Sequence, residues 1–352
     1  MIIALDGMGG DKAPDDIVHG AVKAKDLDVK IALVGPYSKL HSLLEQYPAE
    51  ERNHIEIHHA PQVVEMADPP TWVFKEKKDS SIAMTVKLVA DKKADAAVSA
   101  GNSGAFMAAA VRFLRTPGIA RPAIGAILPG LKGKVILVDA GANIDCQPRH
   151  LLDFAIMGEA YMKAVEKRPN PAIGLVSIGE EPNKGTQLVR RAHDLLKRSQ
   201  LNFVGNIEGR DFFSGRVDVV VTDGFTGNVV LKGAEGIGKV LKRVIYREFP
   251  QGTIGKIALI PLYPSILRIQ KSLDYHEYGG APLLGVEGVC IVGHGSSNAR
   301  AIYVTIQQAR EMVSSRVYEL IKEKIREEKH RGFLFGRDHR GRHLQPEESP
   351  DE

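Results

Sequence analysis

Several glycine-rich polar segments of the sequence carry residues suited to binding an anion. The segment G-N-S-G at residues 101–104 follows an apolar run and precedes a helical pattern, so its backbone N–H groups meet at a helix N-terminus. Such an arrangement binds phosphate without needing a cationic side chain. The alternative is a tight strand-to-helix connection that requires small residues. Ser103 is not expected to act as a nucleophile, because the segment lacks the G-x-S-x-G spacing of hydrolases.

Three further segments offer groups for positioning a substrate or moving a proton. Asp6 ends an apolar run ahead of Gly9 and Gly10, which let a ligand approach the backbone, although the segment is not a G-x-G-x-x-G dinucleotide motif. His294 lies between two glycines, and an imidazole that titrates near neutral pH suits proton transfer. Lys184, in a charged loop, can reach a phosphate or an oxyanion. The alternatives are a capping role for Asp6 and a solvated Lys184.

The segment D-G-F-T-G-N at residues 223–228 has short polar side chains that can orient a ligand through hydrogen bonds. These are Asp223, Thr226 and Asn228. The alternative is a turn that caps a long helix beginning at residue 229. We expect no metal site, since His58 and His59 are adjacent on a predicted strand and point to opposite faces, and H-E-x-x-H is absent. The residues therefore predict a phosphate-handling protein without a metal.

A predicted sheet brings these segments together. Short β-branched runs alternate with helical patterns, at residues 2–5, 30–34, 55–58, 96–99, 135–139, 172–177, 217–222 and 289–292. This alternation is typical of an α/β fold with a buried, mostly parallel sheet. Ligands bind outside the carboxyl ends of the strands in such sheets, so we expect the glycine-rich segments to converge on one site.

The C-terminal third has a different pattern. Helical spacing predicts long helices over residues 229–249 and 299–328, and a disordered tail from about residue 331 to 352. Between the helices, Pro261 and Pro264 interrupt an apolar segment at 253–267, which predicts a helix-break-helix tip. Nearby basic residues suit a lipid interface, and the candidate membrane contacts are Ile254, Ile257, Leu259, Ile260, Leu262, Ile266 and Leu267. The alternative is a buried dimer contact.

Composition narrows the function classes. The 352 residues include 47 Lys and Arg against 43 Asp and Glu, a formal net charge of +4, and 43% hydrophobic residues. These values suit a globular chain, and the scarcity of aromatics argues against a nucleic-acid groove. Two cysteines cannot form a disulfide framework, and neither a signal peptide nor a spanning segment is visible. We expect a soluble cytoplasmic protein, with association at a membrane surface left open.

The ordered motifs together resemble the bacterial phosphate acyltransferase family, the acyl-carrier-protein:phosphate transacylases. The motifs are I-A-L-D-G-M-G-G-D-K-A-P, S-A-G-N-S-G-A, V-D-A-G-A-N, G-E-E-P-N-K-G, D-G-F-T-G-N, Y-G-G-A-P-L-L-G-V and G-H-G-S-S-N. The resemblance covers residues 1–330. It implies a three-layer αβα fold similar to phosphotransacetylase and to isocitrate and isopropylmalate dehydrogenases, built as one domain of two lobes. A helical protrusion near residues 229–272 and long dimer-forming helices would complete it.

The resemblance also implies a reaction and its partners. Acyl carrier protein loaded with a fatty acyl group would react with inorganic phosphate to give acyl phosphate, which a membrane glycerol-phosphate acyltransferase consumes in phospholipid synthesis. The enzyme would be a homodimer without a cofactor and peripheral to the cell membrane. Carrier docking would use basic residues such as Lys239, Lys242 and Arg243, since the carrier is acidic.

Direct attack of phosphate on the thioester is the mechanism we expect, because no serine or cysteine has a base partner at motif spacing. The expected catalytic residues are Lys184, His294, Asp6 and Asp223. The expected substrate-binding residues are Gly9, Gly10, Gly101, Asn102, Ser103, Gly104, Asn143, Thr226, Asn228 and Asn298. Three other functions are weighed: a phosphotransacetylase acting on acyl-CoA, a non-catalytic acyl-phosphate or phospholipid sensor, and a metal-dependent decarboxylating dehydrogenase.

Overall fold

A single sheet runs through the molecule, seen in a computed structural model that describes residues 1–248 and 278–335. In spatial order its strands are β3 (Ile55–His59), β2 (Lys30–Gly35), β1 (Ile2–Asp6), β4 (Ala96–Ser99), β11 (Val289–Val292), β10 (Ala281–Leu284), β5 (Ala123–Gly130), β6 (Gly133–Val138), β9 (Val219–Val221), β7 (Ile173–Val176) and β8 (Phe203–Ile207). Neighbouring strands are parallel except where β10 and β5 meet their neighbours. The predicted α/β class with a mostly parallel sheet is confirmed.

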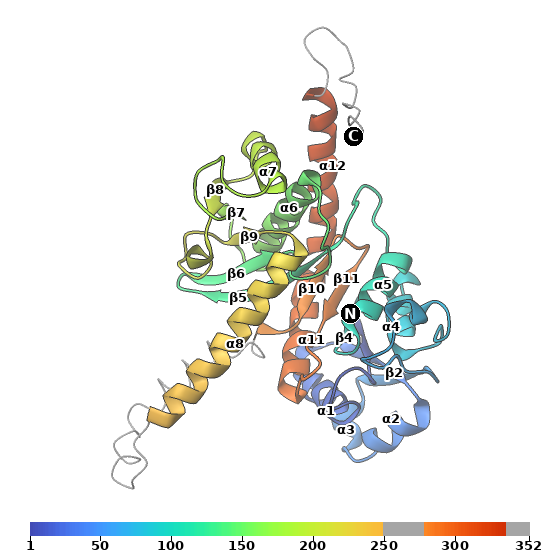
Figure 1. Cartoon of the computed structure of the whole chain (residues 1–352). Coiled ribbons are helices and arrows are strands. Elements are labelled where there is room, and N and C mark those ends of the chain that lie inside the picture. The colour runs from blue at the N-terminus through green and yellow to red at the C-terminus, as the bar shows by residue number, and fades with distance from the viewer. Residues whose placement is uncertain (249–277, 336–352) are drawn as a thin grey trace.

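Helices cover both faces of this sheet (Figure 1). They are α1 (Asp15–Lys23), α2 (Tyr37–Leu44), α3 (Ala49–Arg52), α4 (Ser81–Ala90), α5 (Ser103–Phe113), α6 (Pro148–Ala164), α7 (Gln187–Arg198), α8 (Gly224–Glu248), α11 (Ala299–Ser314) and α12 (Val317–Phe335), with short 3₁₀ turns at Ala24–Leu27, Pro70–Val73 and Gly209–Asp211. Successive residues of a strand point to opposite faces. Ile3 and Leu5 of β1 therefore share a buried cluster with Ile302 of α11, whereas Ala4 shares one with Phe106 of α5.

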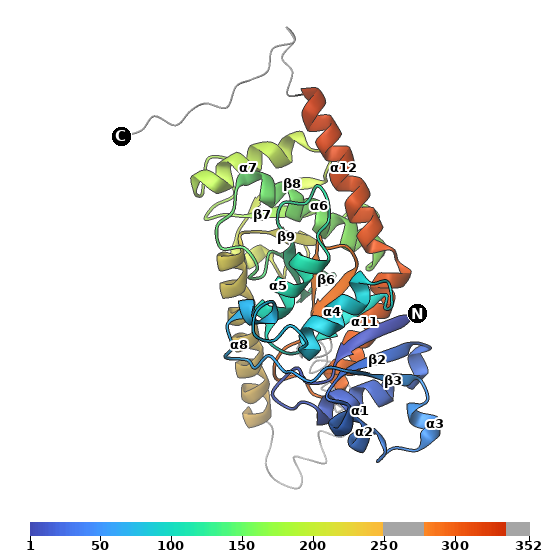
Figure 2. The ribbon, with the colours of Figure 1, turned by 90° about the vertical axis from the view of Figure 1, so that its right-hand side faces the viewer.

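The sheet has two halves, which join at β10 and β5. β10 contributes only Leu283 and Leu284 to its pairing with β5, at Ile124 and Ala123, so within the described residues the remaining length of β5 has no strand partner on that side. The half from β3 to β10 carries α1, α4, α5 and α11, and the half from β5 to β8 carries α6 and α7. α12 packs against α6 on the outside of the second half (Figure 2). A space between the halves follows from their short junction.

Two expected element boundaries are wrong in a way that matters for function. α8 begins at Gly224, five residues before the expected start at 229, and it then extends away from the body (Figure 1). The D-G-F-T-G-N segment is therefore the cap and first turn of a helix, not a loop ahead of it. The expected helix over 299–328 is two helices, because Arg316 adopts a left-handed φ of 53° between α11 and α12.

The predictions for the C-terminal tail and for the apolar tip have different outcomes. α12 continues to Phe335, past the expected start of a disordered tail at residue 331. The apolar tip at 253–267, with its seven candidate membrane contacts, lies outside the described residues, as does the chain beyond 335. Among the residues that the structure describes, no helix combines the length and apolar composition needed to span a membrane.

Candidate active site

A cavity of about 490 Å³ lies where the two halves of the sheet diverge. Its polar lining comes from Asp11, Ser103, Asn228, Lys232, Glu235, Tyr278, His294 and Ser296, and its apolar lining includes Met66, Ile124, Ala126, Ile127, Ala140, Leu231 and Val292. The segments that follow β1, β4, β6 and β11 all reach it, as does one face of α8. The expected convergence of glycine-rich segments at the carboxyl ends of the strands is thus seen, and the volume suits a small-molecule site.

Asp6 holds the first-half loops together beneath this cavity. Its Oδ2 accepts a hydrogen bond from Ser99 Oγ at 2.7 Å and its Oδ1 accepts one from the N–H of Met8 at 3.1 Å. Complete burial raises the pKa of Asp6, and these hydrogen bonds oppose that rise. A Cβ on Gly9 would stand 2.6 Å from Asp6 Oδ2 and equally close to the N–H of Gly101, so only glycine fits. Asp6 is placed to shape the loops and does not line the cavity.

Asn102 is fully engaged by the protein itself. Its Oδ1 accepts the N–H of Ala105 at 3.0 Å and so caps α5. Its Nδ2 donates to the backbone carbonyls of Glu65, Met66 and Asp68 at 3.1, 3.3 and 2.9 Å. The side chain thereby fastens the 65–68 loop, whose Met66 lines the cavity. Ser103, one residue on, lines the cavity directly, in the first turn of α5 where backbone N–H groups have no partner within the helix.

Asp139 gives the loop after β6 the same support that Asp6 gives the loop after β1. Its carboxylate accepts the backbone N–H groups of Ile124, Gly141, Ala142 and Asn143 at 2.7–3.2 Å, and the amide Nδ2 of Asn143 at 2.9 Å. Burial raises the pKa of Asp139 despite these donors. Asn143 also donates to the carbonyl of Pro122 at 2.8 Å. Asn143 is therefore a loop-fixing residue, and Asp139 is a second one that the sequence reasoning did not single out.

The first turn of α8 packs tightly on this loop. Asp223 caps the helix, since its Oδ1 accepts the N–H of Thr226 at 2.9 Å and its Oδ2 accepts the Thr226 hydroxyl at 2.8 Å. A Cβ on Gly227 would lie 1.8 Å from the carbonyl oxygen of Asp139, so no larger residue fits. This contact directs Asn228 into the cavity. The capping alternative for Asp223 and Thr226 is the one that the geometry supports.

His294 meets α8 across the cavity. Its Nδ1 accepts the backbone N–H of Ser296 at 3.1 Å and lies 2.8 Å from the Ser296 hydroxyl. Its Nε2 is 3.9 Å from Oε2 of Glu235, which in turn pairs with Lys232 at 3.1 and 3.2 Å. The sequence reasoning missed Lys232 and Glu235. The signal was present, because Asn228, Lys232 and Glu235 repeat at the four- and three-residue spacing of one helix face.

The remaining candidates lie outside the cavity lining. Asn298 caps α11 by accepting the N–H of Ala301 at 2.9 Å. Lys184 is exposed on the loop after β7 and contributes nothing to the cavity wall. Gly10 allows close approach to the carbonyl oxygen of Gly295, 3.1 Å from where its Cβ would be, and a Cβ on Gly104 would stand 2.7 Å from Pro70. Of the expected residues, the cavity thus brings together Ser103, Asn228 and His294.

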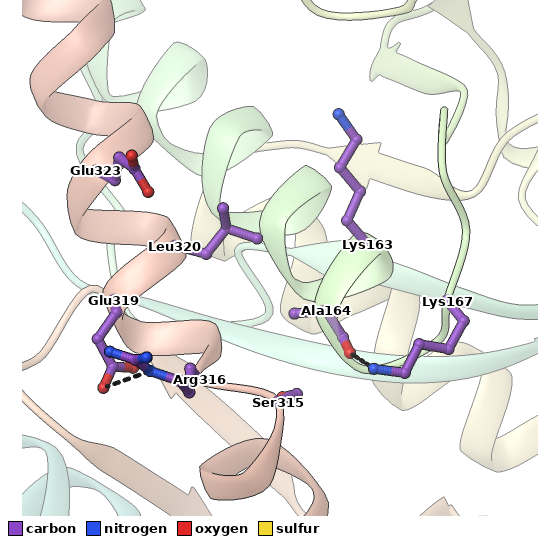
Figure 3. A pocket seen from close by; sticks show the side chains of 8 residues that line it. All are labelled: Lys163, Ala164, Lys167, Ser315, Arg316, Glu319, Leu320 and Glu323. Carbon is purple, nitrogen blue, oxygen red and sulfur yellow. Dashed lines mark hydrogen bonds and ion pairs between the residues drawn. The ribbon is translucent and has the colours of Figure 1, made fainter.

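A second hollow, of about 400 Å³, lies between the end of α6 and the start of α12 (Figure 3). Part of its charged lining pairs within the hollow: Lys167 Nζ donates to the carbonyl of Ala164 at 2.6 Å, and Arg316 lies 3.7 Å from Glu319. α6 starts near the carboxyl end of β6 and runs antiparallel to that strand. Its last turn therefore lies toward the amino ends of the strands, away from the cavity. None of the expected chemical residues reaches this hollow, and the first cavity is the candidate site.

Potential metal ligands and both cysteine thiols occur within residues 1–248 and 278–335. No group of three or more His, Cys, Asp or Glu side chains in these ranges is arranged to hold a metal ion. Burial raises the pKa of Cys146 to about 11 and that of Cys290 to about 12. Both thiols are therefore almost wholly protonated near neutral pH, which makes them poor nucleophiles.

Comparison with solved structures identifies this fold. The solved phosphotransacetylase from Streptococcus pyogenes matches with a TM-score of 0.61 over 91% of this chain and 94% of that one, at 16% identity, which shows a common fold. The EutD phosphotransacetylase from Staphylococcus aureus matches with a TM-score of 0.57 at 15% identity, over 92% of this chain and 94% of that one. The molecule is thus an α/β protein of phosphotransacetylase-like fold.

Sequence relatives are more specific. Residues 1–320 match the family described as fatty acid synthesis protein. The phosphate acyltransferase of Syntrophotalea carbinolica is 47% identical over 320 residues, 90% of this chain and 92% of that protein. The phosphate acyltransferase of Endomicrobium trichonymphae is 46% identical over 330 residues, 92% of this chain and 98% of that protein. The chain belongs to the phosphate acyltransferase family, and the expected resemblance is confirmed.

Proposed function

We propose that this protein transfers a fatty acyl group from acyl carrier protein to inorganic phosphate, releasing acyl phosphate for phospholipid synthesis. One observation carries the proposal. The same cavity combines groups that attract an anion, namely the first turn of α5 at Ser103 and the side chains of Lys232 and His294, with an apolar wall. An enzyme that joins phosphate to an acyl chain needs both surfaces in contact, and relatives named phosphate acyltransferase share most of the sequence.

The reaction follows from this placement. Hydrogen phosphate, held near Ser103 and Lys232, attacks the thioester carbonyl carbon through an oxygen. The new C–O bond converts the carbonyl group into a tetrahedral intermediate, which collapses as the C–S bond breaks, and the proton that phosphate loses ends on the thiolate of the carrier. Asn228 and His294 are placed to donate hydrogen bonds to the oxyanion of the tetrahedral intermediate. Lys184 remains a candidate catalytic residue, although it lies outside the cavity wall. Asp6 and Asp223 position the backbone of the segments around the cavity.

No covalent acyl-enzyme is part of this scheme. The raised pKa of the Cys146 thiol leaves little thiolate to attack a thioester. Rapid quenching during turnover, followed by mass spectrometry of the intact chain, tests the point directly. We expect the unmodified mass at every time, and an acyl adduct on Ser103 or Cys146 would overturn direct attack.

Homodimer formation belongs to the same proposal. The described part of α8 exposes an apolar surface that includes Phe225, Val229, Ile237 and Val240, with exposed fractions of 57–63%. Several large apolar side chains exposed on one helix favour a protein partner. Light scattering is expected to give twice the monomer mass for the wild-type chain and a smaller mass for Ile237→Glu. A monomeric wild type would contradict the dimer.

Carrier docking and membrane association complete the proposal. Lys239 and Arg243 are exposed on α8 and suit an acidic carrier protein. The protein would be cytoplasmic and reach the inner membrane surface through residues 253–267, beside the acyltransferase that consumes its product. Flotation with anionic liposomes is expected to carry the wild type upward and to leave Ile260→Glu and Leu267→Glu behind. Equal flotation of all three would contradict the membrane role of this segment.

A phosphotransacetylase acting on acyl-CoA is the second candidate, because the structural neighbours carry that kind of name. Donor comparison separates the two. Thiol release is measured with palmitoyl carrier protein and with acetyl-CoA, each with and without phosphate. The proposal expects phosphate-dependent release from palmitoyl carrier protein to exceed that from acetyl-CoA by at least about tenfold in kcat/KM. The opposite preference would favour the second candidate, and tight binding without release would favour a sensor.

A further inference from the structure

Lys232 and Glu235 form a charged pair on the α8 face that lines the cavity. Lys232 Nζ lies 3.2 Å from Oε1 and 3.1 Å from Oε2 of Glu235, so one ammonium group bridges both carboxylate oxygens. The Glu235 side chain is only 11% exposed, whereas that of Lys232 is 54% exposed. A carboxylate withdrawn from water needs such a partner to offset its lost hydration. The exposed ammonium group keeps access to a ligand.

His294 approaches the same carboxylate from the other half of the molecule. The backbone N–H of Ser296 can only donate, so His294 Nδ1 accepts and the ring proton is on Nε2. Nε2 lies 3.9 Å from Glu235 Oε2, which is close enough for electrostatic attraction. Glu235 therefore faces two proton donors, one from α8 and one from the segment after β11. The three side chains line one cavity.

Resting on the proposed function, we propose that Lys232 binds the phosphate substrate and that Glu235 is a positioning residue that orients Lys232 and His294 toward the reacting atoms. Lys232 suits phosphate because it presents a cation to the cavity that Ser103, in the first turn of α5, also lines, and the exposed Lys184 is not part of that wall. Glu235 acts through its neighbours: it holds the Lys232 ammonium group by an ion pair and attracts the His294 imidazole. At 3.9 Å the Nε2–H of His294 is not hydrogen-bonded to Glu235, so phosphate and the thioester oxygen meet donors in fixed positions.

Steady-state kinetics distinguish these two roles. Lys232→Met removes a charged donor to phosphate, and we expect KM for phosphate to rise by about 10- to 100-fold while KM for the acyl donor changes little. Lys232→Arg keeps the cation and should recover part of that loss. Lys197→Met, an exposed lysine on α7, is the matched control.

Glu235→Gln tests positioning. The neutral amide keeps the shape of the side chain but loses the charge that attracts the ammonium group and the imidazole. We expect kcat to fall about tenfold with an unchanged melting temperature. The control is Glu45→Gln at the C-cap of α2, where an exposed glutamate lies 3.5 Å from His41 in a comparable pair outside the site. The double variant Lys232→Met/Glu235→Gln should show no larger loss of kcat than Glu235→Gln alone, because the effects of residues that act as a unit are not additive.

Calorimetric titration of inorganic phosphate into the protein without acyl donor gives a readout besides activity. Binding is expected for the wild type and for Lys197→Met, and binding at least about tenfold weaker for Lys232→Met. Equal phosphate affinity and equal phosphate KM in Lys232→Met would overturn its role, and wild-type kcat in Glu235→Gln would overturn the positioning role. A wild-type chain that releases no thiol from acyl carrier protein would instead refute the proposed function, whatever the variants do.

Discussion

Substitution of Asn102 separates two roles for its side chain. A phosphate ligand predicts a loss of phosphate affinity, whereas a residue that caps α5 and holds the 65–68 loop predicts a loss of stability. Its Oδ1 caps α5 through the N–H of Ala105, and its Nδ2 holds three carbonyls of the 65–68 loop. Asn102→Ala removes both functions. Asn102→Ser keeps an oxygen that can cap the helix but is too short to reach the loop. The two variants therefore separate the cap from the clamp.

The magnitudes follow from the contacts. An N-cap is worth about 1 kcal/mol, and serine and asparagine cap about equally well. The amide has two N–H protons, so its three carbonyl contacts amount to at most two full hydrogen bonds, each worth about 1 kcal/mol net. We expect the free energy of unfolding to fall by roughly 2 kcal/mol in Asn102→Ser and by roughly 3 kcal/mol in Asn102→Ala. The difference between them is the cap.

Urea denaturation measures these losses, and steady-state kinetics measure their effect on the cavity. A released 65–68 loop displaces Met66 from the cavity wall, so kcat/KM for the acyl donor should fall in both variants while KM for phosphate changes little. The reasoning would be refuted by an Asn102→Ser variant of wild-type stability that has lost phosphate affinity. That result would make the Asn102 amide a direct phosphate ligand.

Three other predictions follow from single positions. Gly227→Ala should lower the free energy of unfolding by more than about 3 kcal/mol, because the new Cβ would overlap the Asp139 carbonyl. Gly236→Ala, with open space around it, should raise that free energy by about 0.5–1 kcal/mol in the same urea assay. Burial raises the pKa of Asp153 from 3.8 to about 6, so the folded state holds this proton to higher pH than the unfolded state and stability falls as pH rises from 4 to 6. The free energy of unfolding of Asp153→Asn should therefore rise relative to that of the wild type by up to about 3 kcal/mol between pH 4 and 7, and the difference should stay level above pH 7. A constant difference across that range would contradict a raised pKa for Asp153. Alkylation of Cys146 by iodoacetamide should be slow at pH 7 and accelerate about tenfold per pH unit up to pH 10. Fast labelling at pH 7 would contradict a thiol pKa of about 11. The Cys146→Ser variant should retain activity.

The sequence predicted the parallel part of the sheet well, because uninterrupted apolar runs such as Ala96–Ser99 and Val289–Val292 are buried on both faces. It did not predict β5, β8 and β10. Each contains residues that are rare in strands: Pro129 and Gly130 end β5, Gly205 and Asn206 lie within β8, and Pro282 lies within β10. β5 and β10 each pair in an antiparallel hairpin with the strand that follows, and β8 is an edge strand beside β7. Their place in the sheet therefore comes from strand pairing, which overrides a weak local propensity.

The site shows the same limit. Glycine-rich segments at strand ends correctly indicated one shared cavity, since the edge of a parallel sheet brings strand ends together. Short polar residues in those segments proved ambiguous: Asp223 and Asn298 cap helices, and Asn102 caps and clamps. The same residue types serve caps and ligands, so spacing alone does not separate them. Lys232 and Glu235 became visible as site residues only once α8 was seen to begin at Gly224 and to turn that face to the cavity.

Phosphorus NMR of a single reaction mixture shows whether phosphate itself attacks the acyl thioester. Palmitoyl carrier protein, inorganic phosphate and the wild-type chain are combined while free thiol is followed in parallel. We predict a new acyl phosphate resonance that grows in step with free thiol, and no thiol release when phosphate is left out. Thiol release without phosphate, or release that yields free fatty acid and no acyl phosphate, would contradict it.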